Sequence, residues 1–351
     1  MDKRSFLILL APILFLYNSY SQEVKEETSS GFSELFQNDE LMQVSLRYSN
    51  KDIKKETNDS TYIYTYLKYA DKDQSWDSLE VRLRRRGNFR LENCNYAPLK
   101  VKIKKSAAKD SPFEDHKNLK MVLPCLEQRD MNDNVIKEYL AYKLYEVISP
   151  YHFKTQLAEL KYEELRGNKI KTHDFKTFFI EDDKHVAKRI GGKVIKSNIH
   201  PLNHMDRESV RNSFFQFMIG NTDFSNAYQH NCKLIFIEGE IIPIPYDFDM
   251  AGMVNTSYAT VSQINNEQLS IERVTERMYR GFQREAKIFH EVRLEFLNKR
   301  PALLKVIQDC EQLFEDEKEY FSTLLFIEGF FEILNNEEKF ENQILAMARR
   351  K

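Results

Sequence analysis

Near the middle of the chain, three polar residues occur in an order that metal-dependent phosphoryl transfer requires. Asp223 is followed eight residues later by Asn231, and Asp247 comes sixteen residues after that, beyond an apolar stretch. In that chemistry one carboxylate orients the attacking hydroxyl, while an amide and a second carboxylate hold a divalent metal ion against the nucleotide phosphates. The alternative is local turn chemistry, because Asp and Asn side chains commonly bond the nearby backbone.

The spacing suggests a role for each of these side chains. Asp223 is the candidate catalytic residue, because it would orient or deprotonate the acceptor hydroxyl. Asn231 and Asp247 are the candidate metal ligands, since Mg²⁺ and Mn²⁺ prefer amide and carboxylate oxygens. Asp249, two residues further on, would hold a second ion or cap the turn. His230 fits a structural anchor for the loop better than a catalytic group.

Two segments combine an apolar and a cationic face with the two-residue period of a β-strand. They are residues 79–86 and 98–105, and their cationic side chains are Arg82, Arg84, Arg86, Lys100, Lys102 and Lys104. Like charges that face one another destabilise a strand pair, so an anionic partner is expected if the two strands form a hairpin. A nucleoside triphosphate or an anionic polymer would fit, and a solvated sheet face is the alternative.

Nucleotide binding on this face would need a lysine that is held on a strand and oriented by a carboxylate. Lys102 lies in the middle of its strand and Lys100 is the second choice, while Glu138 on the following helix is the expected carboxylate. Arg84 and Arg86 are the further cofactor-binding candidates. The alternative for Glu138 is an ordinary surface position on its helix.

Hydrophobic periodicity predicts the elements that would position these residues. Strands are expected at 41–48, 61–69, 79–86, 98–105, 155–163, 175–181, 232–237 and 240–244, and helices at 132–148, at 206–219 and throughout the chain after about residue 266. The polar stretch 49–60 is expected to be a connection, and residues 191–201 a loop. Phe248, between two aspartates, is expected to turn its ring inward.

The start of the chain has the features of an export signal. Lys3 and Arg4 precede an apolar run at 6–16 and a small-residue cleavage site before Gln22, so residues 1–21 are expected to be a signal peptide. The mature protein is expected to be periplasmic, on the cell surface or secreted, without a transmembrane segment, because no later apolar run is long enough. A net charge of −2 gives no reason to expect a nucleic-acid partner.

Four cysteines follow the expected signal peptide, namely Cys94, Cys125, Cys232 and Cys310. They are too widely spaced for a zinc site. An oxidising compartment permits disulfides, and Cys94 with Cys125 is the expected pair because both flank the basic sheet region. Free buried thiols are the alternative.

The order of these elements is that of a two-lobed protein kinase. We therefore expect an α+β fold of the atypical protein-kinase-like type, with an antiparallel sheet lobe followed by a mainly helical lobe. The expected parts are a signal peptide (1–21), a polar leader (22–40), a sheet-rich N-lobe (41–183) and a helical C-lobe with the catalytic loop (184–351). The cleft would lie between the basic sheet and the loops at 221–231 and 245–250.

Several motifs resemble those of one known family, the CotH-type secreted and spore-coat kinases. They look more similar still to a group of uncharacterised exported proteins from Bacteroidetes. The motifs are Arg84-Arg-Arg-Gly-Asn88 with the Lys-rich strand after it, Phe178–Glu181, Asn221-Thr-Asp223 and Pro245–Asp249. The resemblance covers roughly residues 79–255 and implies the kinase-like fold, ATP, a divalent metal ion and phosphorylation of serine on protein substrates.

Two features depart from the ordinary kinase pattern. The spacing from Asp223 to Asn231 is eight residues, where ordinary kinases have about five, so Asn226 in the longer loop is a rival metal ligand. No glycine-rich phosphate loop is recognisable. The expected function is an exported ATP- and metal-dependent phosphotransferase that acts on a protein or glycan hydroxyl. The alternative is a non-catalytic, pseudokinase-like surface protein that binds an anionic polymer.

Overall fold

The computed structural model describes residues 34–350 apart from 38, 72, 88 and 265–266. These residues belong to one compact unit, Ser33–Lys351. The expected signal peptide (1–21) and most of the expected polar leader (22–40) lie outside the described residues. In the part of the chain that is described, no helix is long and apolar enough to span a bilayer.

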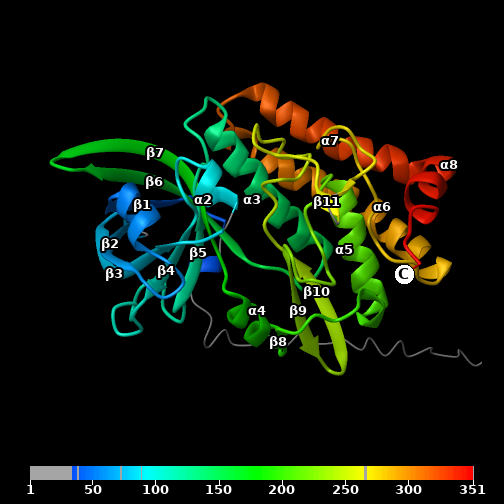
Figure 1. Cartoon of the computed structure of the whole chain (residues 1–351), viewed down its shortest axis with the longest axis horizontal. Helices are drawn as coiled ribbons and strands as arrows, with labels where there is room; N and C mark the ends of the chain where they lie inside the picture. The colour runs from blue at the N-terminus through cyan, green and yellow to red at the C-terminus, as the bar shows by residue number, and fades with distance from the viewer. Residues whose placement is uncertain (1–33, 38, 72, 88, 265–266, 351) are drawn as a thin grey trace, which may run out of the picture. The chain divides into compact units, whose positions relative to one another are not determined.

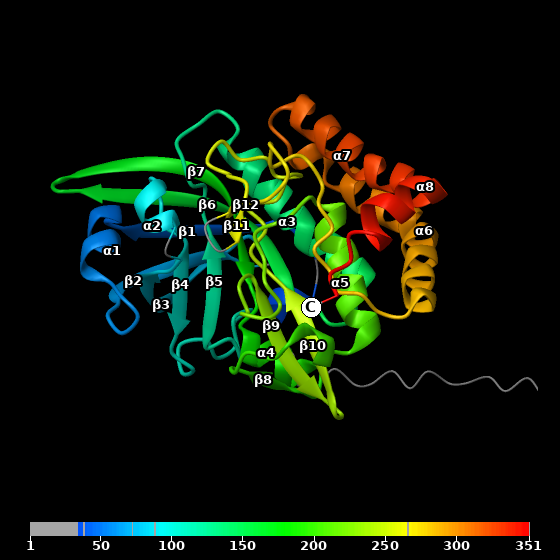
Figure 2. The same ribbon diagram turned by 45° about the vertical axis from the view of Figure 1, so that its right-hand side comes forward.

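Seven strands of the described chain close into a barrel in the order β1-β2-β3-β4-β5-β7-β6 (Figure 1, Figure 2). They are β1 (Met42–Tyr48), β2 (Ile63–Ala70), β3 (Trp76–Arg85), β4 (Leu99–Ile103), β5 (Asn118–Val122), β6 (Thr155–Arg166) and β7 (Lys169–Ile180). Neighbouring strands pair antiparallel except β1 and β6. The parallel pairing of β1 with β6 runs from Met42 opposite Ala158 to Tyr48 opposite Glu164 and closes the barrel.

The expected two-lobed kinase-like fold is therefore wrong. Its small lobe required an antiparallel sheet, whereas these strands form a closed mixed barrel. The order of elements along the chain does not reveal which strand edges pair, and the closing pairing joins residues 116 positions apart. The short strand β5 was also not expected, because its five residues lie between polar loops and show no long alternation.

The barrel encloses a hydrophobic core that is built by alternate residues of its strands. On β3 and β4 the inward side chains are the predicted ones, each at most 3% exposed: Leu79, Val81, Leu83, Leu99, Val101 and Ile103. The two strands pair as the expected hairpin, with Arg82 opposite Lys102 and Arg84 opposite Lys100. The cationic side chains therefore share the outer face of the barrel.

A second hydrophobic core lies between the barrel and the remaining elements. The longer helices are α3 (Met131–Ile148), α5 (Asp206–Met218), α6 (Ala286–Asp309) and α7 (Glu317–Asn335), and a separate antiparallel sheet contains β8 (Lys193–Ile195), β9 (Cys232–Ile237) and β10 (Glu240–Pro245). This core includes Phe178 of β7, Leu140 of α3 and Phe215 of α5. α3 packs against both β7 and α6, so it links the barrel to the helices (Figure 1).

Some short elements occupy segments that were expected to be irregular, and others lie in the stretch after about residue 266 that was expected to be helical. The expected connection at 49–60 contains α1 (Asn50–Glu56), because Ser49 Oγ accepts the N–H of Asp52 and caps the helix. The other short elements are α2 (Phe89–Asn93), α4 (Asp183–Arg189), α8 (Glu337–Phe340), β11 (Gln263–Ile264), β12 (Glu267–Gln268), 3₁₀ turns at Glu34–Phe36, Pro201–Asn203 and Glu311–Leu313, and a π turn at Glu341–Leu345. β8 lies within the expected loop 191–201. Residues 269–285 contain no helix, so that part of the helical expectation is wrong.

A disulfide joins Cys94, which follows α2, to Cys125, which follows β5. This confirms the predicted pair. The backbone N–H groups of Asn95 and Tyr96 also donate to the carbonyl oxygen of Cys125, at 2.7 and 3.3 Å. Cys232 and Cys310 are buried free thiols.

Candidate functional site

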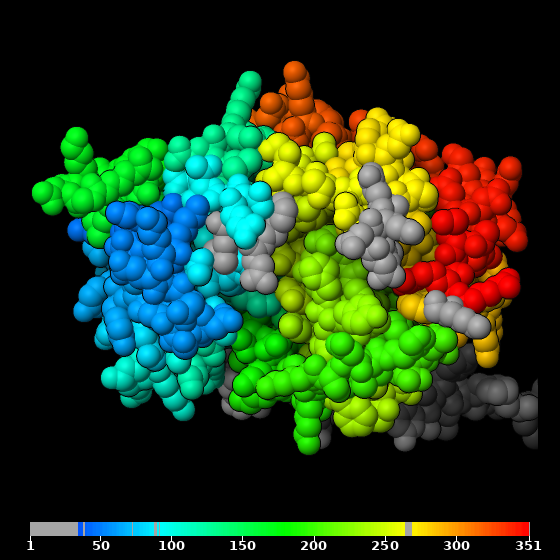
Figure 3. All heavy atoms as spheres, in the orientation of Figure 1, coloured from blue at the N-terminus to red at the C-terminus, as the bar shows by residue number. Residues whose placement is uncertain are grey.

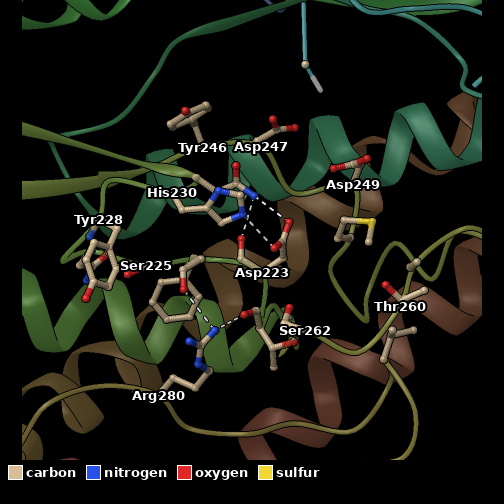
Figure 4. A pocket seen from close by; sticks show the side chains of 18 of the residues that line it. Asp223, Ser225, Tyr228, His230, Tyr246, Asp247, Asp249, Thr260, Ser262 and Arg280 are labelled. Carbon is tan, nitrogen blue, oxygen red and sulfur yellow. Dashed lines mark hydrogen bonds and ion pairs between the residues drawn. The ribbon is translucent and has the colours of Figure 1, made fainter. Parts of the chain in front are cut away.

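A cavity of about 1830 Å³ is lined by the loop at 222–231, the segment at 246–250 and the cationic edge of the barrel. Figure 4 shows this cavity from close by, with Asp223, His230 and Asp247 grouped on one side of it. The lining includes Asp223, Asn231 and Asp247 from the loops, and Arg86, Lys100 and Lys120 from the barrel. Side chains that are far apart in the sequence therefore face one space.

The turn that ends α5 holds Asp223 in place. Gly220 has a φ of +64°, the left-handed conformation in which many helices end, and a Cβ there would meet Phe326 at 2.8 Å. Asn221 is only 1% exposed and donates to Gln216 Oε1, while its own Oδ1 accepts the N–H of Asp223 at 2.9 Å. The Asn-Thr-Asp motif is thus a turn whose buried amide orients the backbone of Asp223.

Two neighbours share the carboxylate of Asp223. His230 Nε2 lies 2.9 Å from Oδ1, and Asn231 Nδ2 donates to Oδ2 at 3.0 Å and to the backbone oxygen of Asp223 at 2.7 Å (Figure 4). Paired backbone hydrogen bonds between Ser225 and His230 close the loop. The hydrogen bond with Asp223 raises the pKa of His230. Asp223 retains acceptor capacity, because a carboxylate has about four lone-pair sites.

The two rival amides both line the cavity, but Asn231 is hydrogen-bonded to Asp223 and Asn226 to Asn212. The bonds that Asn231 makes through Nδ2 leave its Oδ1 available to a cation. Asn226 is 7% exposed, and its Oδ1 accepts a hydrogen bond from Asn212 Nδ2 at 3.3 Å. Of the two amide oxygens, that of Asn231 is therefore the more accessible candidate for a cation.

Backbone hydrogen bonds place Asp247 close to Asn231. The N–H of Tyr246 donates to the carbonyl oxygen of Asn231 at 3.1 Å, and the N–H of Asp247 donates to Tyr142 Oη of α3 at 2.9 Å. Asp247 has a φ of +65°. A left-handed backbone at a residue other than glycine costs about 1–3 kcal/mol and persists only where the surrounding structure holds it.

Positive side chains surround the carboxyl group of Asp247 and lower its pKa. Its Oδ2 lies 4.0 Å from Nη1 of Arg86. Loss of hydration would raise the pKa of Asp247, but the positive charges of Arg86, Arg90 and Lys120 outweigh this and hold the pKa below its ordinary value. The cavity therefore presents a carboxylate next to a cationic wall.

Glu138 and Asp249 both bind Arg90 of α2. Arg90 Nε donates to Asp249 Oδ2 at 2.7 Å, and Nη2 donates to Glu138 Oε2 at 2.9 Å. Tyr258 Oη donates to the same oxygen of Asp249 at 3.1 Å. The three charged residues are at most 7% exposed. Burial raises the pKa of both carboxyl groups in spite of the guanidinium.

This buried cluster differs from the arrangement expected for Glu138. Glu138 was expected to orient Lys100 or Lys102, and its partner is Arg90 instead. Arg90 also lines the cavity. The sequence contained no signal for it, because the residues after Arg86 suggested only a turn.

The three consecutive arginines of the Arg84-Arg-Arg motif reach three different places. Arg84 Nη1 pairs with Asp59 at 2.6 Å, outside the cavity. Arg85 Nε donates to the carbonyl oxygen of Thr57 at 2.7 Å. Arg86 alone lines the cavity. The motif therefore supplies one cation to the site, where two were expected.

The two candidate lysines also separate. Lys100 lines the cavity, whereas Lys102 lies further out with its Nζ 5.5 Å from the ring centre of Tyr62. Lys120 on β5 stands opposite Lys100 and is a third lysine that sequence reasoning missed. The lysine could not be placed because β5 itself was not expected.

Lys120 Nζ is enclosed by aromatic rings. It lies 4.1 Å from the ring centre of Tyr246 and 5.2 Å from that of Phe153. It has no hydrogen-bond partner among the described residues. Burial, together with the charges of Arg86 and Lys233, lowers the pKa of Lys120 to about 7. An anion in the cavity would therefore satisfy the unpaired Nζ group and favour its ammonium form.

A cation at Asn231 and Asp247 would have to share its coordination with other oxygens. Within the described ranges, no three side chains of His, Cys, Asp or Glu form a group that could hold a metal ion. Mg²⁺ commonly binds through one or two carboxylates and completes its shell with water and substrate phosphates. The chain matches no protein-family model and no curated protein.

Proposed function

We propose that the protein is a metal-dependent phosphotransferase, which moves the γ-phosphoryl group of a nucleoside triphosphate such as ATP to a hydroxyl of a protein or glycan. The observation that supports this is the meeting of Asp223, Asn231 and Asp247 in a cavity that also contains Arg86 and Lys120. Support comes from the site and not from the barrel, because one fold can serve many functions.

The cationic side of the cavity suits a polyphosphate. Arg86 Nε and Lys120 Nζ are buried donors without hydrogen-bond partners in the described chain. Lys100 and Lys233 line the same space. Unpaired buried donors cost free energy, and phosphate oxygens would satisfy them with charge-assisted hydrogen bonds.

Asn231 and Asp247 fit a divalent metal ion. Asn231 offers its amide oxygen, since its amide nitrogen already donates a hydrogen bond to Asp223, and Asp247 offers a carboxyl group whose pKa is lowered. Mg²⁺ or Mn²⁺ bound there would neutralise charge on the phosphates. Asp249 is less suited to the expected role of metal ligand, because its Oδ2 accepts hydrogen bonds from Arg90 and Tyr258.

Asp223 would orient the acceptor. In the transfer, the hydroxyl oxygen bonds to the γ-phosphorus, the bond to the bridging oxygen breaks, and the nucleoside diphosphate leaves. Asp223 accepts the hydroxyl proton through its free lone pairs, while His230 and Asn231 hold the carboxylate in place. The side chain of Asp223 is 30% exposed, so an acceptor can reach it.

Export remains part of the proposal. Disulfides persist in oxidising compartments and are rare in the cytosol. The Cys94–Cys125 disulfide therefore supports the expected periplasmic, cell-surface or secreted location.

Ligand-induced stabilisation tests the proposal without knowledge of the acceptor. A non-hydrolysable ATP analogue with Mn²⁺ should raise the melting temperature of the protein, because a ligand that binds only the folded state stabilises it. Asp247→Ala should abolish this rise. Asp309→Ala is the matched control, since Asp309 is exposed at the end of α6 and pairs with Lys305. The proposal fails if no nucleoside triphosphate, with or without metal, changes the melting temperature.

A further inference from the structure

The outer face of the barrel carries a row of tyrosines beside a row of cations. Tyr62, Tyr64 and Tyr66 are alternate residues along β2 and the position before it. Tyr64 stands opposite Arg82 of β3, and Arg82 stands opposite Lys102 of β4. We call these five residues the tyrosine face. Tyr64 is 68% exposed and Tyr66 is 60% exposed. Figure 3 shows the N-terminal part of the described chain, in blue, at the surface.

The cations of the tyrosine face contact aromatic rings and not carboxylates. Arg82 lies 6.0 and 5.9 Å from the ring centres of Tyr62 and Tyr64, and Lys102 lies 5.5 Å from that of Tyr62. Neither cation forms an ion pair with a carboxylate of the described chain, unlike the adjacent Arg84. A cation–π contact at an exposed site contributes only about 0.5–1 kcal/mol, so both charges remain available to an anionic ligand.

A second row of cations lies beside the tyrosine face, because the row that holds Arg82 and Lys102 ends opposite Asn118. Arg84 stands opposite Lys100, and Lys100 stands opposite Lys120. Lys100 and Lys120 both line the cavity. Because neighbouring strands lie about 4.8 Å apart, these three side chains leave the sheet at roughly that interval, and they lead from Arg84 on the outer face to the buried Lys120 of the cavity. Such a path suits an extended anionic chain better than a small ion.

Rings interleaved with cations suit either an acidic polysaccharide or a single-stranded nucleic acid. The Cys94–Cys125 disulfide favours the first, since disulfides persist in oxidising compartments, where extracellular polysaccharides occur. A sugar ring would lay its C–H face on Tyr64 or Tyr66, while its carboxylate or sulfate groups approach Arg82 and Lys102. We propose that the tyrosine face binds an acidic polysaccharide. None of its five residues lines the cavity, so this binding does not require the proposed phosphotransfer.

Calorimetric titration of the full chain with polygalacturonate, alginate and dextran sulfate tests the proposal. At least one of these should bind, more weakly as salt increases, whereas neutral dextran should not bind. The double variant Tyr64→Ala with Tyr66→Ala should lose about tenfold or more in affinity. The double variant Arg82→Gln with Lys102→Gln should bind weakly and lose most of the salt dependence.

Two controls separate this result from other causes. Phe321→Ala removes a ring on α7 that is 46% exposed, and it should leave binding unchanged. Stabilisation by a nucleotide and Mn²⁺ should be the same in the tyrosine variants and the unaltered protein. The two measurements therefore test the two proposals separately. The proposal is overturned if none of the three polymers binds, if the tyrosine variants bind them normally, or if oligothymidylate binds the tyrosine face more tightly.

Discussion

Arg90 Nε lies 2.7 Å from Asp249 Oδ2, and this contact joins residues 159 positions apart in the chain. Asp249 follows Asp247 by two residues, so Arg90 holds the segment that carries a candidate metal ligand. Glu138 of α3 binds the same guanidinium. Three distant parts of the chain therefore meet at one buried cation beside the cavity.

Replacement of Arg90 should strongly destabilise the protein. Arg90→Met leaves two buried carboxyl groups without their counter-charge, and we expect a loss of about 3–5 kcal/mol in the free energy of unfolding. Urea unfolding would measure it. Arg273→Met is the control, because Arg273 is 77% exposed and pairs with Glu276, and such pairs contribute about 0–1 kcal/mol. Equal losses in both variants would show that the cluster does not stabilise the fold.

The pH dependence of the Arg90→Met deficit follows from the raised pKa values of Glu138 and Asp249. A raised pKa in the folded state means that folding favours the protonated form. The stability contribution of each group is therefore present at low pH and lost as pH rises through its folded pKa. Without Arg90 both pKa values should rise further, so the deficit should be larger at neutral than at acidic pH.

Asp223→Asn should separate activity from stability. The amide keeps the shape of the side chain but cannot accept the proton of an acceptor hydroxyl, so transfer of labelled phosphate from ATP should be lost. Because the substitution affects few hydrogen bonds, the free energy of unfolding should fall by at most about 1 kcal/mol. Labelled transfer and urea midpoints would be measured together. Unfolding of this variant, or unchanged transfer, would make Asp223 a structural turn residue.

Nucleotide binding should cause proton uptake at Lys120. With a pKa of about 7, this amine is largely neutral at about pH 8, and a nearby triphosphate would favour the ammonium form. Calorimetry in buffers of different ionisation enthalpy should detect the proton. Lys120→Met should abolish the uptake, while Lys104→Met, at an exposed position, should keep it. Uptake that persists in Lys120→Met would assign the proton to another group.

The same group affects the stability of the free protein. Because the folded-state pKa of Lys120 lies below its usual value of 10.5, folding favours the neutral amine. Its contribution to stability therefore rises with pH between about 7 and 10.5. Lys120→Met should lack this slope in a series of unfolding measurements.

Phe248 contributes to the core and not to the chemistry. Its side chain is 0% exposed, and its ring centre lies 4.7 Å from that of Tyr142 and 5.4 Å from that of Phe215. Phe248→Ala should therefore cost about 3–5 kcal/mol. Phe321→Ala, at an exposed ring, should cost far less. Comparable urea midpoints for the two variants would contradict this account of the 246–249 segment.

Local structure was predictable where a periodic pattern was long. The alternation of β3 and β4, the helix of α3 and the inward ring of Phe248 were all expected, because burial of one face imposes the spacing. Closure of the barrel was not predicted, because nothing in the local sequence of β1 or β6 indicates that the two strands pair. β5 and α2 were not predicted because they are too short to show a periodic pattern. Lys120 on β5 and Arg90 on α2 were therefore not placed at the site.

The candidate site was predictable in part, because its loop residues lie close together in the sequence. Asp223 and Asn231 are eight residues apart and contact one another directly. Pairings over long distances could not be foreseen. Glu138 binds Arg90 and not a strand lysine, because the choice among partners depends on where α2 is anchored by the disulfide.

The parallel pairing of β1 with β6 constrains how the chain can fold. As the polypeptide is made, β1 cannot pair with β6 until β6, 116 residues later, has been synthesised. The barrel therefore cannot close early, and one edge of β1 stays unpaired. Exposed strand edges recruit other chains, and long loops must close before such contacts form. The growing or translocating chain would therefore need protection from aggregation until residue 166, the end of β6, is available.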